Sequence, residues 1–460
     1  MFRKISTCLV IALVAVICIS DDAYNLLTYL VGPGALLGMA FTRTALDGYI
    51  KRTYDPKFID NSISEMSDQM LSTITKKTDG EGGEDFTWMA DVDDVDGGSP
   101  DFPTAQTAAS ANASTAGSKF RSDWFPYSDV AQLTSDIIGR TRNKDGAWQE
   151  ATDTAMRKKM RAIAHNNGVV LQGYGWGEIS TIASVSGSTF VPGIRSDITK
   201  YIKGMPLHFS QSLHGHVLRS TTVLYVTKVS YTPGNELVTL SGTLASVSAV
   251  NGDTAFRAGA RENSATPARL VPVGFGGFVP NQTSGGTDMT DATVTTMLGV
   301  DRTSNSRLYG TWIDATGGGS AISALIDGCQ EALTVGNAKT LRCFASKGVY
   351  AQIAKDLNNG VVYNDNPQNK TVGTRRLTIY SSDKQEATLE VSRLTNDNQI
   401  WGFAPPTVIL KSIGGAPHLD SEDGLTMARQ SSAAGYEIRW FQQYLYQFAD
   451  PASTLRVQLV

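Results

Sequence analysis

The sequence predicts a mixed protein of the α+β class, and three observations support that prediction. From 375 to 460, short β-branched and apolar runs alternate with Gly, Pro, Asp and Ser, which is typical of strands and turns. From 146 to 168, apolar residues recur at helical spacing. From 191 to 269 the chain is again rich in turns and strands.

The composition is that of an ordinary globular protein. The chain has 460 residues, of which 41% are hydrophobic and 18% charged, and this length allows two or three domains. A net charge of −4 argues against a dedicated nucleic-acid binder, which would usually carry a basic excess. Outside the N-terminal stretch only Cys329 and Cys343 remain, without a C-x-x-C partner, so we expect two buried, reduced thiols.

The N-terminus carries an apolar leader pattern. Arg3 and Lys4 precede an apolar run from Cys8 to Ile19, as in a signal peptide or a short membrane anchor. The composition changes abruptly at Met39, where a polar and charged stretch begins. We therefore expect residues 1–38 to be absent from the mature protein; a leader that is used would instead imply export.

A helix and a long hairpin are expected next. Apolar residues between 55 and 77 recur every three to four positions, which predicts a helix. The stretch from 79 to 118 holds nine acidic residues and no Lys or Arg, and its later part, 104–118, is Ala/Ser/Thr-rich and predicted to be poorly ordered. The acidic run from 91 does not fit a twelve-residue calcium loop. Phe86 and Trp88 alternate as one strand of the predicted hairpin, and Phe120 and Trp124 belong to the returning strand.

The segment from 146 to 168 predicts one long amphipathic helix. Met156, Met160 and Ile163 follow the 3.6-residue repeat, and Asn166 to Gly168 form a stop signal. The G-Y-G-W-G segment at 173–177 lacks the Lys and Ser/Thr of a phosphate loop, so we expect a connection with two aromatic anchors. Basic residues line the other side of the helix: Arg157, Lys158, Lys159 and Arg161.

Two further regions have distinct patterns. Strands at 222–229 and 236–240 around Pro-Gly-Asn predict a hairpin, with a third strand at 243–250. Farther on, helices at 322–333 and 346–357 flank a strand, T-L-R-C-F-A, which predicts an α+β domain. His208, His214 and His216 lack supporting ligands at a suitable spacing, so no metal site is predicted.

The C-terminal pieces resemble a known family. A strand pair is followed by L-K-S-I-G-G, a D-G-L turn and two final strands, Y-E-I-R-W-F-Q-Q-Y-L-Y-Q-F and T-L-R-V-Q-L-V. Their order resembles the closing region of tailed-bacteriophage major capsid proteins with the Hong Kong 97-like fold. The segment at 298–316 also resembles one seen in this group.

The resemblance implies an organisation for the whole chain. It implies an α+β, Hong Kong 97-like capsid fold with an N-terminal arm, an extended loop hairpin, a spine helix, peripheral and axial domains and an inserted β-barrel-like module. The expected parts are a leader at 1–38, the arm at 39–84, the extended loop at 85–145, the spine helix and start of the peripheral domain at 146–190, the β-rich insertion at 191–295, the axial domain at 296–372, and the peripheral and closing strands at 373–460.

The resemblance also implies a function. Such a protein would assemble in the host cytoplasm into hexamers and pentamers of an icosahedral head that encloses double-stranded DNA, and it would reside in the virion. Its partners would be copies of itself, a separate scaffolding protein, a portal, decoration proteins and DNA contacted non-specifically, with no cofactor and no membrane in the mature state. The candidate inter-subunit contacts are Phe86, Trp88, Phe120, Trp124, Arg157, Lys158 and Arg161.

Two other classes of function stay open. An exported or membrane-anchored β-rich binding protein, such as an adhesin or glycan binder, would use the leader and present exposed Trp88, Trp124 and Trp176 to a ligand. A hydrolase would use His418 with Asp420. Because the sequence contains neither G-x-S-x-G nor H-E-x-x-H, we do not predict an enzyme, and no catalytic residue is proposed.

Overall fold

The computed structural model divides into two compact units, formed by Met1–Asp60 with Leu133–Thr154 and by Asn61–Gln132 with Ala155–Val460. The first unit contains the helix α6 (Ser135–Thr141) and the first four residues of the helix α7 (Ala151–Gln172). The leader and the expected start at Met39 lie outside the described residues. The structure describes residues 68–78, 82–90, 99–111, 118–141, 151–211, 217–264, 269–280, 295–303, 306–317, 320–336, 338–358, 377–381, 385–419, 428–430 and 434–459.

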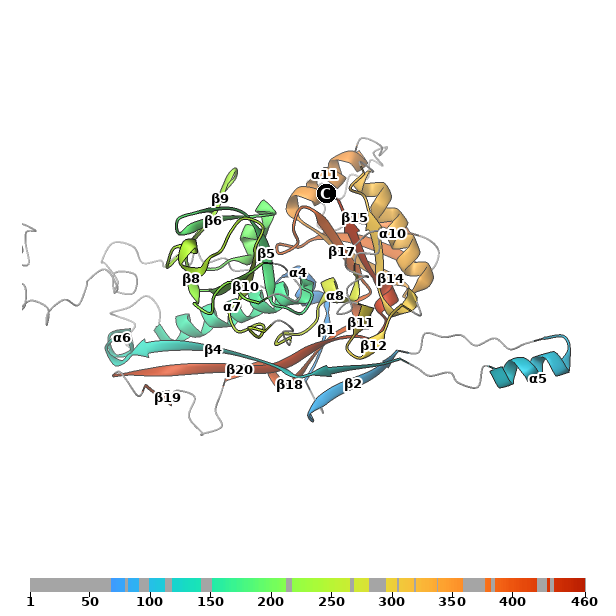
Figure 1. Ribbon diagram of the computed structural model, residues 1–460, viewed down its shortest axis with the longest axis horizontal. Helices are drawn as coiled ribbons and strands as arrows, with labels where there is room; N and C mark the ends of the chain where they lie inside the picture. Colours follow the sequence, from blue (N-terminus) through green and yellow to red (C-terminus); the bar gives the residue numbers. More distant parts are fainter. Residues whose placement is uncertain are drawn as a thin grey trace, which may run out of the picture. The chain divides into compact units, whose positions relative to one another are not determined.

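A sheet of long strands supports the second unit (Figure 1). Its central pair, β18 and β20, is antiparallel, and burial alternates along much of β20, as expected of a half-buried strand. On its other side, β18 pairs in parallel with β1. The prediction of a helix over 55–77 is therefore wrong at its end, because residues 75–77 form this strand. The members are β1 (Thr75–Lys77), β18 (Val408–Leu419), β20 (Gly435–Phe448), β19 (Ala428–Arg429) and β4 (Phe125–Thr134), which pairs with β20.

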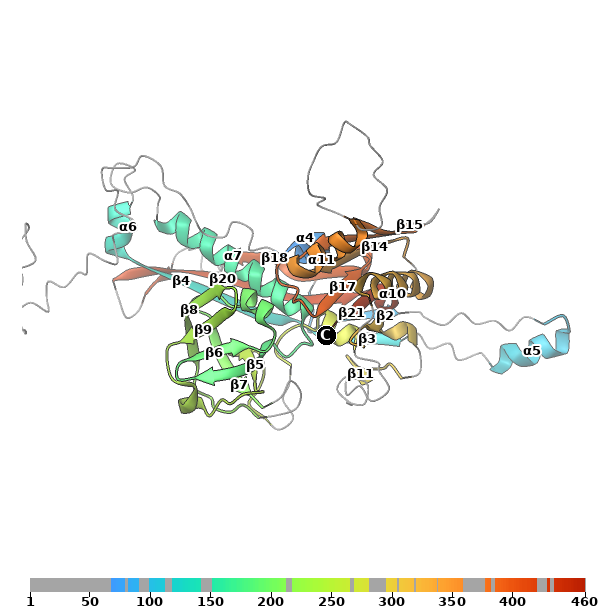
Figure 2. The ribbon, with the colours of Figure 1, turned by 90° about the horizontal axis from the view of Figure 1, so that it is seen from above.

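The long helix α7 (Ala151–Gln172) lies alongside these strands (Figures 1 and 2). The predicted stop at Asn166 to Gly168 is wrong, because the helix continues to Gln172. The Asn167 side chain is buried and bonded to Gln442 of β20, so its polar groups are satisfied inside the fold. Gly168 allows close approach, since an added Cβ would lie 2.7 Å from Leu394 Cδ1.

A second sheet has six strands and two long helices. The predicted helices and the predicted strand between them are confirmed as α10 (Ala321–Val335), α11 (Lys347–Asn358) and β14 (Thr340–Ala345). Strands from beyond the predicted boundary at 372 join this sheet, because β14 pairs with β16 on one side and β17 on the other. The order is β13 (Thr311–Asp314), β21 (Thr454–Gln458), β17 (Gln399–Phe403), β14, β16 (Glu386–Val391) and β15 (Leu377–Ser381).

The core of this sheet contains both described cysteines. Cys329 on α10 and Cys343 on β14 are fully buried free thiols whose Sγ atoms lie 3.5 Å apart. The contact with Cys329, together with burial, raises the pKa of the Cys343 thiol, which keeps it protonated. The expectation of buried, reduced thiols is therefore confirmed.

A closed six-stranded barrel forms the β-rich module. It begins with β5 (Glu178–Ser186), before the predicted boundary at 191. The predicted hairpin is confirmed, with Gly234 at a φ of 83° in its turn. The predicted strand at 243–250 is wrong: it contains the 3₁₀ turn η2 (Leu244–Val247), which buries Leu244 and Val247 together. Around the barrel run β10 (Thr254–Arg257), β5 (Glu178–Ser186), β6 (Thr189–Pro192), β9 (Asn235–Leu240), β8 (Leu224–Thr232) and β7 (Pro206–Ser210).

The predicted long hairpin is present as β2 (Asp85–Ala90) and β3 (Ser118–Asp123). The expectation that 104–118 is poorly ordered is wrong for its first part, which belongs to the helix α5 (Phe102–Ala111). Asp101, which precedes this helix, accepts hydrogen bonds from the Thr104 backbone N–H and hydroxyl at 3.2 and 2.6 Å. Shorter elements complete the fold: α4 (Gln69–Thr73), η1 (Arg195–Lys200), α8 (Phe275–Phe278), β11 (Thr296–Met297), β12 (Val300–Asp301), η3 (Ser306–Leu308), η4 (Pro405–Thr407) and η5 (Pro451–Ser453).

Candidate assembly surfaces

The base of the β2–β3 hairpin is anchored in the chain's own core. Trp88 and Phe120 face each other in register, and their rings stack at 5.4 Å between centroids. The Trp88 Nε1–H donates a hydrogen bond to the Phe448 carbonyl of β20 at 3.0 Å. Trp88 is 6% exposed and Phe120 is fully buried. In the single chain these two predicted contact residues are therefore core side chains.

The other two predicted aromatics of the hairpin are partly accessible. Phe86 is half-buried, and the Lys411 ammonium lies 4.1 Å from its ring centroid. Trp124, also half-buried, tilts against Phe86 at 6.1 Å. The neighbour of Trp88 in the strand, Met89, is 60% exposed because alternate side chains of a strand point to opposite faces.

The hairpin continues into an exposed helix. At the start of α5, Phe102 is 78% exposed, which makes it the most exposed large hydrophobic side chain among the described residues. Phe102 is therefore a candidate contact residue, because aromatic side chains are enriched where protein surfaces bind one another. Sequence composition did not identify it, because the surrounding small residues indicated disorder.

The four basic residues that were predicted on one side of α7 differ in exposure and in ion pairing. Lys159 forms an ion pair with Asp129 of β4 at 2.6 Å, while Arg157 and Lys158 are exposed and Arg161 is half-buried. Met160, predicted to face the core, is 43% exposed. The apolar stripe of this half of the helix is therefore narrower than its sequence predicted.

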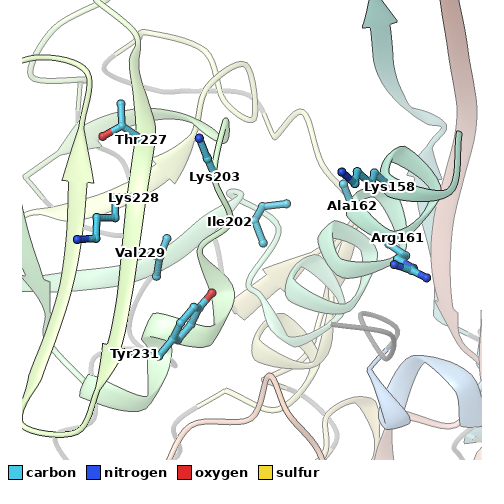
Figure 3. Close-up of a pocket in the computed structure, with 9 residues that line it drawn as sticks. All are labelled: Lys158, Arg161, Ala162, Ile202, Lys203, Thr227, Lys228, Val229 and Tyr231. Carbon is cyan, nitrogen blue, oxygen red and sulfur yellow. The ribbon is translucent and has the colours of Figure 1, made fainter. Parts of the chain in front are cut away.

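A pocket of about 530 Å³ lies between α7 and the barrel (Figure 3). It brings two of the predicted residues, Lys158 and Arg161, beside two barrel lysines, Lys203 and Lys228, which the sequence pattern did not single out. In Figure 3 the Lys158 side chain points from α7 toward the barrel. Its apolar lining comes from Ala162, Ile202, Val229 and Tyr231.

A buried polar network ties the end of the N-terminal segment to the fold. The Asp68 carboxylate accepts hydrogen bonds from Ser392 Oγ at 2.6 Å and Gln172 Nε2 at 3.3 Å. Burial raises the pKa of Asp68 above its ordinary value, while these hydrogen bonds oppose the shift. Sequence reasoning missed this network because Asp68 and Ser392 are far apart in the chain.

The histidines give no support to a metal or catalytic site within the described residues, which contain no group of three His, Cys, Asp or Glu suited to a metal ion. His208 contacts the Thr221 carbonyl at 3.3 Å, and His418 packs perpendicular to Phe441 in β20. The partners proposed for them, His214, His216 and Asp420, lie outside the described residues.

The tryptophans that a glycan binder would present are not all on the surface. Trp88 and Trp176 are 6% and 4% exposed, and the Arg269 guanidinium lies 4.9 Å from the Trp176 ring centroid. The alternative that used them as exposed ligand platforms is corrected on this point. Among the described residues, no helix is both long enough and apolar enough to cross a membrane.

No family model and no curated protein matches the chain. Among solved structures it is similar to the cyanophage A-1(L) capsid, with 10% identity, a TM-score of 0.49, and coverage of 89% of this chain and 97% of that one. It is also similar to the capsid of an empty GTA particle, with 7% identity, a TM-score of 0.45, and coverage of 88% and 95%. A third similar structure is the satellite phage P4 procapsid including size determination (Sid) protein, with 11% identity, a TM-score of 0.34, and coverage of 92% of this chain and 94% of that one.

Proposed function

We propose that this protein is the major capsid protein of a tailed bacteriophage. Its copies assemble as hexamers and pentamers into an icosahedral head that encloses double-stranded DNA, and its site of action is the virion. Four parts of the chain's own architecture support this: the anchored β2–β3 hairpin, the long helix α7 beside the β18–β20 pair, the six-stranded α/β sheet and the closed barrel.

The hairpin carries the proposal. Its base is fixed by the Trp88–Phe448 hydrogen bond and by the buried Phe120 ring, whereas the helix beyond it presents Phe102 to solvent. An ordered segment that buries its base and exposes its far aromatic residue is suited to hold a second copy. Because the donor and acceptor surfaces of such a contact differ, its repetition produces a ring when the rotation between copies closes.

The accessible residues of the predicted contact set fit the same role. We propose inter-subunit contacts for Phe86 and Trp124 at the hairpin and for Arg157, Lys158 and Arg161 on α7. Trp88 and Phe120 would act through the hairpin, by holding its base in place.

The charge of the chain fits a container better than a DNA-binding surface. A net charge of −4 disfavours tight, sequence-independent binding to phosphates, so packaged DNA would be contacted only weakly. A separate scaffolding protein, a portal and decoration proteins are the further partners we propose. No enzymatic step and no cofactor enters this function.

Electron microscopy of purified protein tests the proposal. The full chain and a version that starts at Met39 are each expressed with and without a scaffolding protein encoded beside the gene. Closed shells or hexameric rings tens of nanometres across are expected. Monodisperse monomers in all four preparations would overturn the proposal and favour the exported binding protein.

A further inference from the structure

The pocket between α7 and the barrel combines a rigid apolar lining with positive charge. The Tyr231 hydroxyl donates to the Tyr201 carbonyl at 3.2 Å, which fixes the ring while leaving the residue 46% exposed. The turn that carries Ile202 and Lys203 is held by two backbone hydrogen bonds, from Gly204 N to Val226 O at 2.7 Å and from Met205 N to Ile202 O at 3.2 Å. The lining is therefore built before any partner arrives.

Among the described residues, the lysines around this lining differ from neighbouring lysines, which form ion pairs with carboxylates. Lys159 pairs with Asp129, and Lys200 pairs with Asp197 at 2.7 Å. Within the part of the chain that the structure describes, no ion pair joins Lys158, Lys203 or Lys228 to a carboxylate. Lys158 points toward the barrel, whereas the charged ends of Arg161 and Lys228 point away from the space between (Figure 3).

Such a site selects a ligand that is both acidic and apolar. An apolar side chain can cover Ile202, Val229 and Tyr231, while carboxylates meet the ammonium groups at the rim. A nucleic-acid backbone supplies negative charge but would leave the apolar side chains of the pocket exposed to water. A short peptide in which Asp alternates with aliphatic residues supplies both.

We propose that this pocket receives the acidic segment 91–96 of a second copy of the chain. That segment reads D-V-D-D-V-D, with four carboxylates, two valines and no cation, and it directly follows β2 of the hairpin. The inference rests on the proposed function and adds to it a defined pocket and the segment that enters it. Lys158 and Lys203 are the principal cations, and a valine occupies the apolar lining.

Peptide binding to the unassembled full chain tests the pairing. A fluorescent peptide of residues 89–98 should bind the protein in a fluorescence-anisotropy titration, and the same peptide with its four Asp changed to Asn should not. The K158E/K203E variant should bind the acidic peptide at least tenfold more weakly, and salt should weaken the wild-type affinity, as expected for a rim of exposed charges. Equal affinity for the two peptides, or for the variant and the parent, would overturn the proposal.

A matched control separates local from general charge effects. K339E/K347E reverses two exposed lysines of the six-stranded sheet region and should leave peptide binding unchanged. A duplex oligonucleotide serves as the competing anion. If it displaces the peptide and its own binding depends equally on Lys158 and Lys203, the pocket is a nucleic-acid site and the proposal is wrong.

Charge exchange tests the same contact in assembled protein. K158E/K203E and D93K/D94K should each reduce the yield of shells several-fold, and the chain that carries all four changes should recover it. The D93K/D94K variant stays informative if K158E/K203E fails to fold. If the parent and every variant form shells equally well, this inference fails while the capsid function stands. If the parent forms no shells, the proposed function itself fails, and the peptide titration still decides whether the pocket binds the segment.

Discussion

The Trp88 indole joins the hairpin to the core in two ways. Its ring lies between Phe86 and Phe120, with centroid separations of 5.9 and 5.4 Å, and its Nε1–H satisfies the Phe448 carbonyl. Tryptophan residues contribute strongly to both protein cores and protein interfaces, because the side chain combines a large apolar area with one polar group. The residue type alone therefore did not distinguish an inter-subunit contact from an anchor within the subunit.

Replacement of Trp88 should be costly in the isolated subunit. Trp88→Ala removes the ring contacts and leaves the Phe448 carbonyl without its donor, so the free energy of unfolding should fall by about 3–5 kcal/mol. Chemical denaturation measures this loss. Met89→Ala, next to it but 60% exposed, should change stability by less than about 0.5 kcal/mol. Equal effects of the two substitutions would contradict the anchoring role.

His165 should make the stability of the subunit depend on pH. It is fully buried on α7 and contacts the Thr199 carbonyl at 3.0 Å through Nε2. Burial, together with the charges of Arg257 and Arg393, lowers its pKa from 6.5 to about 4, although the Thr199 contact opposes this. The folded state therefore holds the neutral imidazole, while the unfolded chain binds a proton as the pH falls below 6.5.

The stability that neutral His165 provides should be complete above pH 6.5 and should decline as the pH falls toward 4. The loss over that interval should approach about 3 kcal/mol. His165→Gln retains an N–H for the Thr199 carbonyl and should flatten the profile measured by denaturation between pH 4 and 7. His208→Gln, at a more exposed histidine, should leave most of the slope in place. An unchanged slope in His165→Gln would refute this assignment.

At the scale of elements, helix α7 is held to the sheet by side-chain amides. Asn167 and Gln442 exchange hydrogen bonds at 3.3 and 2.8 Å, and the Tyr446 hydroxyl donates to the Asn167 carbonyl at 2.8 Å. Both amides are buried, so loss of one partner leaves the other without its hydrogen bond in an apolar environment. The helix and the sheet should therefore be energetically coupled through this pair.

A double-mutant cycle measures that coupling. Asn167→Ala and Gln442→Ala should each lower the free energy of unfolding by about 1–3 kcal/mol, because each leaves an unsatisfied buried amide. The double variant should lose less than the sum, with a coupling energy of about 1 kcal/mol. Ser230 and Thr232, an exposed hydroxyl pair at 3.4 Å, provide the control cycle, which should be additive. Additivity at Asn167 and Gln442 would show that the amides act independently.

The elements that could be predicted from sequence are those whose pattern is local. Helical spacing of apolar residues predicted α10 and α11, and the turn at Pro233 and Gly234 predicted the β8–β9 hairpin. The errors have tertiary causes. The end of α7 was predicted too early because the side chain of Asn167 is hydrogen-bonded to Gln442 of β20, a contact that the local sequence does not show. The residues of β1 were predicted to be helical because their strand forms only by pairing with the distant β18.

At the scale of the whole molecule, segments distant in sequence build each sheet. β21, at the end of the chain, pairs in parallel with β13 and antiparallel with β17, while Asp68 bonds to Ser392. No local periodicity specifies such partners, which is why the strands at 377–403 and 454–458 were not assigned to the α/β sheet. The candidate surfaces divide in the same way. The hairpin and the cations of α7 could be predicted from the sequence. The positions of Lys203 and Lys228 beside α7 could not, because they depend on tertiary packing.

The hairpin allows folding and assembly to be tested separately. Ala90 and Ser118 are paired in register, so residues 91–117 can be replaced by Asn-Gly, a turn suited to joining two antiparallel strands. The shortened chain keeps Trp88 and Phe120 in the core but loses the acidic segment and α5. It should melt within a few degrees of the parent in calorimetry and yet remain monomeric in sedimentation velocity, because the segment proposed to hold a second copy is gone. Replacing the β8–β9 turn at Pro233 and Gly234 by the same Asn-Gly should leave both melting and shell formation unchanged. Normal shells from the shortened chain would mean that contacts elsewhere on the subunit are sufficient for assembly.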